Sequence, residues 1–547
     1  MNFPKYVKSN TRSLETAIRE AANPMQEWYD EKHDDLPFFA NVVTDIGYNE
    51  PGFKHGFGNF HHTSWSAGHC ANRWMESLYR SMLVGESMDA QTYEKLKKWI
   101  FRIYDNGIGL PANIDLETFE LKKESDICNL RESFYGLACI YLCERDPRTL
   151  EIARTVIDTV DRYLDKQSGV WDDARYQAET GAHAVGLFTG DWDVTRFCNT
   201  FGRFVGGLTV FYQATGMQDA LRLALELADI ALRTDVREDG SFDPERTASH
   251  VYSTSSMLSG IAFLAGLTKD QTLFRRLDAF MRNGYNDVAL PCGWVCENLK
   301  SPTLRGEIND SCDLMEVCLE LGKAGYGEYF TMAERMLRGH ILPSQVLDVC
   351  YISDEPNEDS SKHRMASRCR GAFGFPSPYG HEDSPGSLIS FNWDIVGGVS
   401  GICRAKADAV TRLPDGLVSI NLLFDHKDPL LEVVSPYGNG DKLEILTREH
   451  CPIRVRLPKY TDIPQTLEGL RAANIQASVL GGWLYLTNLK AGQLTCIPLS
   501  LCDQVEKNTF LGHQLAFRWH GDEVTAATSQ GKRLCFFPEL EICGIIE

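Results

Sequence analysis

The sequence lacks several features that would assign it to a common class of protein. It has no run of about 18 apolar residues, so no transmembrane helix is predicted. Its first residues are polar and lead into no continuous apolar segment, so no signal peptide is predicted. Basic residues are outnumbered, the formal net charge is −20, and a nucleic-acid partner is therefore not expected. These absences favour a soluble enzyme that acts on neutral or cationic small molecules.

Familiar catalytic and cofactor signatures are also missing. The glycine-rich segment 202–207 lies inside a helical pattern, so it is not a phosphate-binding loop between a strand and a helix. The chain contains neither a serine nucleophile elbow nor a His-Glu-x-x-His motif. No cofactor is predicted from these patterns.

Cysteine is abundant, but its distribution is not that of a disulfide framework. The 17 cysteines are an odd number, and several, including Cys139, Cys143 and Cys318, fall in apolar stretches with helical spacing. Buried, reduced thiols explain this distribution best, because small secreted proteins are the ones that depend on many disulfides. We therefore predict a cytoplasmic location.

Between residues 65 and 345 almost every segment has the apolar spacing of a helix. Loops rich in Gly, Asp and Pro separate the helices, which come in hairpins of about 40 to 60 residues. Repeated hairpins of this kind can close into a toroid of inner and outer helices, with a pocket at one rim. The clearest segments are 67–83, 130–143, 150–164, 204–215, 220–232 and 251–265.

The pattern changes near residue 410. Short runs rich in Val, Ile and Leu follow, with Gly, Pro, Asn and Asp between them, as in 417–424, 442–447 and 483–487. We predict a helical domain over residues 1–410 and a β-sandwich domain over residues 411–547. Within the first domain, residues 346–410 are predicted to form an irregular link.

The segment 290–345 carries the strongest chemical signal. Glu297 lies in a loop with Trp294, and Asp310, Cys312 and Asp313 follow at the start of an amphipathic helix. One interpretation is that Asp310 or Ser311 caps this helix and that Asp313 is a favourable charge in its first turn. The other is that Asp310 is a functional carboxylate. Cys312 by itself favours packing over metal binding.

The order of these motifs resembles glycoside hydrolase family 127. The loop with Glu297, the acid-Ser-Cys sequence at 310–312, Gly-Tyr-Gly-Glu-Tyr at 325–329 and Ala-Glu-Arg at 333–335 follow the family's order. Looser similarities cover 131–136, 208–216, 249–251 and 417–422, so that the resemblance spans about residues 60–540. It implies an (α/α)6 barrel followed by a β-sandwich domain, and an activity like that of the β-L-arabinofuranosidases.

The resemblance also implies roles for single residues. In the family a glutamate is the general acid and base, and a zinc ion is held by the Glu and Cys of an acid-Thr-Cys motif and by two adjacent cysteines, one of which is the nucleophile. Glu297 matches the acid/base, Asp310 matches the glutamate ligand and Cys312 matches the cysteine ligand.

The chain departs from the family where the adjacent cysteines should be. It contains no Cys-Cys pair, and the corresponding segment is Asn392-Trp393-Asp394. Zinc–thiolate chemistry is therefore not expected. Asp394 is a candidate second carboxylate beside Glu297 and Asp310, or else the cap of a helix that starts near residue 395. A third alternative is a divalent metal held by Asp310, Cys312 and Asp394, with His381 as a further ligand.

Aromatic and polar side chains near the predicted rims are candidates for sugar binding. A sugar site needs an apolar ring face together with hydrogen-bonding groups, although the same residues can also bond to backbone at helix starts. The candidates are His62, Trp65, His69, Glu132, Tyr135, Trp192, His250, Trp294 and Trp393.

The sequence thus predicts a glycoside hydrolase with Glu297 as general acid and with Asp394 or Asp310 as the second catalytic carboxylate. The alternatives are a toroid that binds carbohydrate without cleaving it, motivated by the missing cysteine pair, and a sugar epimerase or lyase that uses His250 or Tyr135 as base. Fold analogy does not choose among them. The predicted partner is a carbohydrate, and the sugar, the linkage and the oligomeric state are left open.

Overall fold

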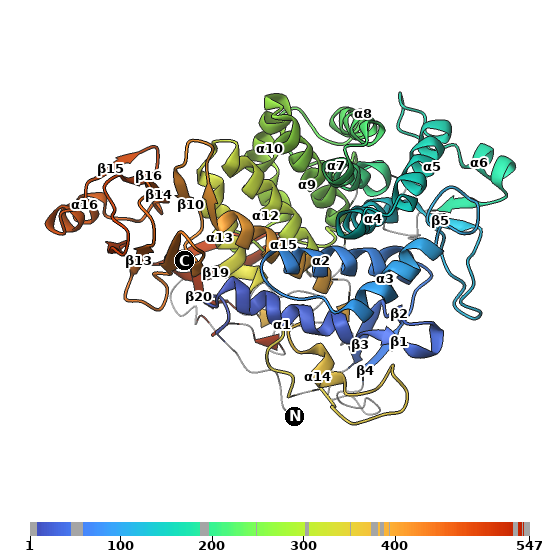
Figure 1. Ribbon diagram of the computed structural model, residues 1–547, viewed down its shortest axis with the longest axis horizontal. Coiled ribbons are helices and arrows are strands. Elements are labelled where there is room, and N and C mark those ends of the chain that lie inside the picture. The colour runs from blue at the N-terminus through green and yellow to red at the C-terminus, as the bar shows by residue number, and fades with distance from the viewer. Residues whose placement is uncertain are drawn as a thin grey trace.

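The computed structural model describes most of the 547-residue chain and arranges it as a ring of helices with the C-terminal strands to one side (Figure 1). The described residues are 8–44, 58–185, 196–247, 249–300, 306–350, 352–373, 381–382, 388–392, 394–528, 534–535, 537–538 and 540.

Six helices form a closed inner ring. Each contacts the next along the chain, and the last contacts the first, so the ring closes between α15 and α2. Inner helices have to be apolar around most of their circumference, and α9 is buried from Val251 to Ala265. The inner helices are α2 (Asn72–Leu83), α4 (Leu130–Glu144), α7 (Arg203–Thr215), α9 (Val251–Thr268), α12 (Ile308–Lys323) and α15 (Asp394–Ala409).

Six further helices cover the ring from outside. They are amphipathic: α5 buries Ile152, Val156 and Val160 at helical spacing and leaves its opposite side exposed. The N-terminal helix α1 packs on α15 and α2, so that the two ends of the helical region complete the sixth pair. The outer helices are α1 (Leu14–Glu27), α3 (Ala90–Arg102), α5 (Arg148–Tyr163), α8 (Gln218–Thr234), α10 (Gln271–Asn283) and α13 (Glu328–Met336).

The predicted (α/α)6 toroid is confirmed, but the prediction of an irregular link over 346–410 is wrong for its last part. Residues Asp394–Ala409 form the sixth inner helix. Its three glycines, at positions 397, 398 and 401, conceal the helical pattern in the sequence. Close packing requires at least one of them, because a Cβ atom at Gly401 would lie 2.6 Å from Sγ of Cys312 on α12.

The predicted β-sandwich follows the ring. One sheet has the order β15-β16-β14-β10-β9 and the other the order β11-β12-β13-β17. Alternating residues such as Leu443 and Ile445 bury one face of each sheet in a shared core. The strands are β9 (Val410–Arg412), β10 (Val418–Ile420), β11 (His426–Lys427), β12 (Leu431–Val434), β13 (Lys442–Thr447), β14 (Ile453–Arg456), β15 (Ala477–Leu480), β16 (Trp483–Leu486) and β17 (Leu494–Pro498), with helix α16 (Ile463–Ala472) between β14 and β15.

A three-stranded sheet of β18 (Asp503–Phe510), β19 (His513–His520) and β20 (Glu523–Ala527) packs instead on the helical region. Its residues Phe510, Leu515 and Trp519 share a core with Trp294 and Cys296 of the loop before α12. The C-terminal part of the chain therefore supports the loop that carries Glu297.

Short elements fill the connections. The remaining strands are β1 (Tyr29–Asp30), β2 (Leu36–Pro37), β3 (Ala40–Thr44), β4 (Gly58–His61), β5 (Glu124–Asp126), β6 (His183–Val185), β7 (His381–Glu382), β8 (Leu388–Asn392) and β21 (Leu534–Cys535). The remaining helical turns are η1 (Glu31–His33), η2 (Ala67–Ala71), η3 (Ile127–Asn129), α6 (Asp173–Thr180), η4 (Cys198–Gly202), α11 (Tyr285–Val288), η5 (Leu337–Ile341) and α14 (Met365–Cys369).

Within the described part of the chain, α9 is the one helix long and apolar enough to cross a membrane by length and composition. It lies in the ring between α7 and α12, where 83% of its apolar window is buried by protein. Burial of the predicted thiols is mixed, since Cys139 and Cys318 are buried and Cys143 is exposed.

Close contact between inner helices sets the width of the ring. At the crossing of α7 and α9, a Cβ atom on Gly260 would lie 2.5 Å from the backbone nitrogen of Gly206. We predict that Gly260→Ala lowers the free energy of unfolding by about 2 kcal/mol, the usual scale of an overpacked core. Urea denaturation measures this change.

Gly469→Ala in α16 is the matched control. A Cβ there would meet Cγ of Pro498 at 3.6 Å, an ordinary contact, so the change should be neutral or slightly stabilising. Equal effects of the two substitutions would contradict the role given to the crossing of α7 and α9.

Candidate active site

The N-terminal ends of the inner helices meet at one end of the ring. Short elements precede several of them directly: η2 leads into α2, η3 into α4 and η4 into α7. Strand β8 ends at Asn392, just before α15, and pairs through β3 with β4, which leads towards α2. Side chains that start these helices are therefore brought together from segments far apart in the sequence.

The loop that carries Glu297 is anchored on both sides by backbone contacts. An antiparallel bridge joins His250 to Asn298, and the Val251 N–H donates to the Glu297 carbonyl at 2.8 Å. A second bridge joins Cys296 to Gly306, just before α12. Glu297 is therefore held between the start of α9 and the start of α12.

This arrangement creates a compact cluster of three buried side chains. One ring nitrogen of His250 and one carboxylate oxygen each of Glu297 and Glu307 lie within 4.8 Å of one another. The exposed fractions are 6%, 3% and 1% respectively. Sequence reasoning singled out Glu297 and His250 but missed Glu307, whose only sequence signal is its place directly before the helix of Asp310.

Asp310 joins this cluster from the first turn of α12. Its Oδ1 accepts a hydrogen bond from Ser255 Oγ at 2.8 Å. Burial, followed by the charges of Glu307, Asp313 and Glu297, raises its pKa well above the usual range, and the Ser255 hydrogen bond opposes this. The capping interpretation of Asp310 is wrong, because the residue at the N-cap position is Glu307.

Asp310 is the first member of a line of acidic side chains that follows one face of α12. We call Asp310, Asp313, Glu316 and Glu320 the carboxylate ladder. The three deeper members each have a cation: Arg131 Nη2 lies 2.7 Å from Asp313, Arg404 Nε 2.5 Å from Glu316 and Lys323 Nζ 2.7 Å from Glu320. No ion pair with a cation is found for Asp310 among the described residues. The end of the ladder beside Glu297 is therefore the acidic one.

Two arginines hold the layer of side chains below the cluster. Arg203 Nη2 lies 2.8 Å from Glu132, whose pKa falls to about 2: burial raises it, but the charges of Arg203, His69 and Arg131 outweigh that effect. Arg131 also donates to the hydroxyls of Tyr252 at 3.1 Å and Tyr135 at 3.3 Å. Glu132 and Tyr135, predicted to bind substrate, are thus fully buried members of this network.

His69 and Trp65 lie at the start of α2. The His69 ring bonds Asn129 Oδ1 through Nδ1 at 3.0 Å, and burial lowers its pKa to about 4. The Trp65 ring meets His69 edge-on at 5.2 Å and Phe39 at 4.5 Å. His69 is therefore neutral at physiological pH and buried among aromatic neighbours.

Two predicted sugar-binding residues point elsewhere. Trp294 is fully buried against Phe510 and Gly306, where it shapes the Glu297 loop instead of offering a face to a sugar. His62 is bound to Asp30 and packs on Phe38. Trp192 and Trp393 lie outside the described residues, as do the side chains of Asp394 and His381.

The backbone nevertheless brings the Asp394 segment to the same end of the ring. Helix α15 begins at Asp394, and Gly397, one turn later, packs against Asn309 on the first turn of α12. The three segments that carry Glu297, Asp310 and Asp394 therefore start from one region.

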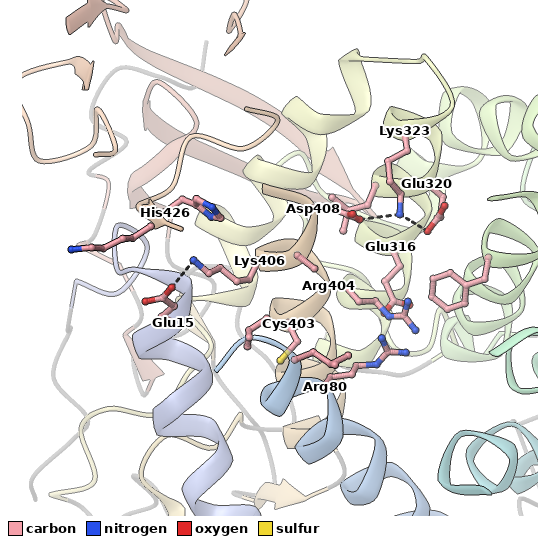
Figure 2. Close-up of a pocket in the computed structure, with 16 residues that line it drawn as sticks. Glu15, Arg80, Glu316, Glu320, Lys323, Cys403, Arg404, Lys406, Asp408 and His426 are labelled. Carbon is pink, nitrogen blue, oxygen red and sulfur yellow. Dashed lines mark hydrogen bonds and ion pairs between the residues drawn. The ribbon is translucent and has the colours of Figure 1, made fainter. Parts of the chain in front are cut away.

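The opposite end of the ring contains a cavity of about 410 Å³ lined by charged residues (Figure 2). Its cations are already paired: Lys323 contacts Glu320 at 2.7 Å and Asp408 at 3.1 Å, and Lys406 contacts Glu15 at 2.7 Å. Arg80 lies 2.6 Å from Glu76. At this end of the ring, acidic and basic side chains are therefore paired with one another.

The zinc–thiolate site of family 127 does not fit these residues. Sγ of Cys312 packs against Gly401 between α12 and α15. In the described part of the chain, no group of three metal-ligand side chains includes this thiol. One nitrogen and two carboxylates, from His250, Glu297 and Glu307, are instead a ligand set for a harder divalent cation.

Comparison with known proteins supports the fold. No family model matches the chain, and no curated protein matches it. Among solved structures, a family 127 β-arabinofuranosidase is similar with a TM-score of 0.56 and 14% identity, over 93% of this chain and 79% of that one. A family 127 β-L-arabinofuranosidase from Geobacillus stearothermophilus T6 is similar with a TM-score of 0.50 and 11% identity, over 87% and 78%. A third structure, a glycoside hydrolase, has a TM-score of 0.53 and 12% identity, over 91% and 84%.

The predicted resemblance to family 127 is therefore confirmed at the level of the fold. At identities of 11 to 14%, this similarity establishes the fold and does not establish which reaction the protein catalyses.

The raised pKa of Asp310 has a consequence for stability. A carboxyl whose pKa is higher in the folded than in the unfolded state holds its proton when folded, so stability falls as pH rises from about 4 towards the folded pKa. We predict that Asp310→Asn, which keeps the acceptor for Ser255, gains stability relative to the parent by up to about 1.4 kcal/mol per pH unit in this range. Urea denaturation of both proteins between pH 4.5 and 7.5 measures the gap. A gap that does not change with pH would mean that Asp310 is ionised in the folded protein.

Proposed function

We propose that the protein is a glycoside hydrolase whose catalytic carboxylates are Glu297 and Glu307. The observation that carries this proposal is the convergence of Glu297, Glu307 and Asp310, with a raised pKa at Asp310, at the end of an (α/α)6 ring. Carboxyl groups with shifted pKa values gather at catalytic sites, because such chemistry needs one protonated and one ionised group side by side.

Burial gives this cluster its chemical character. Burial, followed by the charges of Glu307, Asp313 and Glu297, raises the pKa of Asp310, so the cluster keeps at least one proton at neutral pH. Ladder members deeper in the ring are neutralised by Arg131, Arg404 and Lys323. A protonated acid next to an ionised one is the pair that glycoside cleavage requires.

In the proposed reaction Glu297 protonates the departing glycosidic oxygen, and Glu307 attacks the anomeric carbon. Water then cleaves the glycosyl ester and returns a proton to Glu297. Asp310 keeps a proton in the cluster, and a ring nitrogen of His250 lies within 4.8 Å of an oxygen of each glutamate. The assignment of the second carboxylate differs from the sequence prediction, which named Asp394 or Asp310.

The choice of substrate follows the similar structures. Two of them are β-arabinofuranosidases, so arabinofuranosides are the first substrates to test. The net charge of −20 suits a neutral sugar better than an acidic one. A cytoplasmic enzyme acting on small sugars or oligosaccharides is part of this proposal.

The central test is Glu297→Gln. We expect this variant to cleave nitrophenyl glycosides at least about 100-fold more slowly than the parent, because the amide cannot donate the proton. A panel of pentofuranosides, pentopyranosides and hexopyranosides should be screened first by release of nitrophenol. Asp408→Asn, at the opposite end of the ring, should keep the parent rate, since its carboxylate contacts only Lys323 at 3.1 Å among the ion pairs described.

Two results would redirect the proposal. Conversion of a free sugar into its epimer, with the largest loss in His250→Gln, would identify an epimerase. Sugar binding by calorimetry without any product from the whole panel would identify a binding protein. Full activity of Glu297→Gln would exclude the acid role of this residue.

The separation of the two glutamates predicts the stereochemical outcome. One carboxylate oxygen of Glu297 lies no more than 4.8 Å from one of Glu307, which is shorter than the 6.5 to 9.5 Å or so between the carboxyl groups of inverting enzymes. We expect the first product formed in aqueous methanol to be a methyl glycoside with the configuration of the substrate, detected by proton NMR. An inverted product would mean that water itself is the nucleophile, placed between a general base and the sugar, and so would require a different second carboxylate.

A further inference from the structure

A second cluster of metal-binding side chains lies outside the ring site, in the hairpin that follows α1. Asp30 ends β1, η1 makes the turn, and β2 returns antiparallel to β1. His33 closes the turn, and His62 enters from the segment after β4. One donor atom of each of these three side chains lies within 4.8 Å of the other two.

Both histidines contact the same carboxylate oxygen of Asp30. Asp30 Oδ2 lies 2.6 Å from His33 Nδ1 and 3.1 Å from His62 Nε2. The other oxygen, Oδ1, is occupied by the Lys32 N–H at 3.1 Å. The turn thus fixes the carboxylate so that the oxygen facing both rings has no other role.

Aromatic packing holds both imidazoles in place. His33 stacks on Phe119 at 3.6 Å, and His62 stacks on Phe38 at 4.8 Å and meets Phe119 edge-on at 5.4 Å. The His62 side chain is 7% exposed, whereas that of His33 is 37% exposed. One ligand is therefore fixed inside the protein, and the other leaves a path from solvent.

We propose that Asp30, His33 and His62 form a binding site for a divalent transition-metal ion, with zinc as the best match. Two imidazoles and a carboxylate are ligands that zinc accepts, and with three protein ligands a fourth position stays open for water. The ion would replace the two hydrogen bonds at Asp30 Oδ2 and would tie the hairpin of β1 and β2 to the segment before α2.

The surroundings also indicate how tightly the ion binds. Metal-binding histidines in tight sites bond a further group through the second ring nitrogen. His62 Nδ1 is buried and has no hydrogen-bond partner among the residues that the structure describes. We therefore expect a weak site whose metal exchanges and is lost on treatment with a chelator.

Cobalt(II) is a suitable probe, because its visible absorption reports tetrahedral nitrogen and oxygen ligands. The titration should use full-length, chelator-treated protein carrying Glu297→Gln and Glu307→Gln, which removes the other cluster of three ligand atoms. We expect one cobalt ion per chain, and at least about 100-fold weaker binding after His33→Gln, since even an outer-shell loss costs about 10- to 100-fold.

The chain offers a matched control. His183 Nδ1 lies 3.1 Å from Asp173 in an exposed pair that belongs to no group of three ligands among the described residues. His183→Gln should leave the cobalt spectrum unchanged. His33→Gln is preferred to His62→Gln because its side chain is partly exposed and its loss should not prevent folding.

A rise in Tm on adding zinc to the parent, absent in His33→Gln, would support the site independently. The proposal is overturned if no cobalt binds, or if His33→Gln binds it as tightly as the unsubstituted background. Either result would leave Asp30 as a carboxylate that merely holds two histidines in a hairpin.

Discussion

Closure of the inner ring is the constraint on which the rest of the structure depends. The sixth inner helix comes from residues Asp394–Ala409, while its outer partner α1 comes from the other end of the chain. The ring is therefore complete only when segments almost 400 residues apart in the sequence have come together. Close helix contacts, such as Gly206 with Gly260 and Gly401 with Cys312, then fix its width. Once the width is fixed, the helix starts have no freedom to separate, and the side chains they carry must share one region.

The buried carboxylates inside the ring differ in their partners according to their position along the ring axis. A buried carboxylate costs several kcal/mol unless a cation or hydrogen bonds compensate, on the order of magnitude found for buried ions. Below the helix starts, cations compensate the buried carboxylates: Arg131 forms an ion pair with Asp313, and Arg203 forms one with Glu132. At the helix starts, Asp310 has a serine where its neighbours on α12 have cations. Asp310 therefore carries a cost of burial that an asparagine at this position would not carry.

Much of the fold could be predicted from the sequence because its signals are local. Helices such as α5 show their apolar face directly, and strand β13 alternates buried and less buried residues over its whole length. The sequence did not predict the sixth inner helix, because its glycines lower the helix propensity. Those glycines allow close packing against α12, which is about 90 residues away in sequence. A packing requirement set by α12 cannot be read from the residue pattern of α15 alone.

The candidate site was predicted in part for the same reason. Glu297, Asp310 and His250 could be named because each matched a motif, whereas Glu307 matched none. Its place in the cluster comes from a pair of backbone bridges, His250 to Asn298 and Cys296 to Gly306, that only the folded loop reveals. Trp294 was misjudged because a tryptophan beside an acid looks the same in a sequence whether its ring faces a sugar or a neighbouring sheet.

The similarity to the family 127 structures concerns the scaffold. The similar structures share the scaffold at 10 to 15% identity or so, as expected when packing constrains only the size and polarity of core residues. The missing cysteine pair removes the thiolate nucleophile, yet the helix starts that would present it still converge. At this end of the ring, Glu297, Glu307 and Asp310 gather carboxyl groups in place of thiols. A carboxylate needs no metal to act as a nucleophile, so replacing the thiolate by an acid would remove the requirement for zinc at this end of the ring while preserving the geometry that the fold imposes.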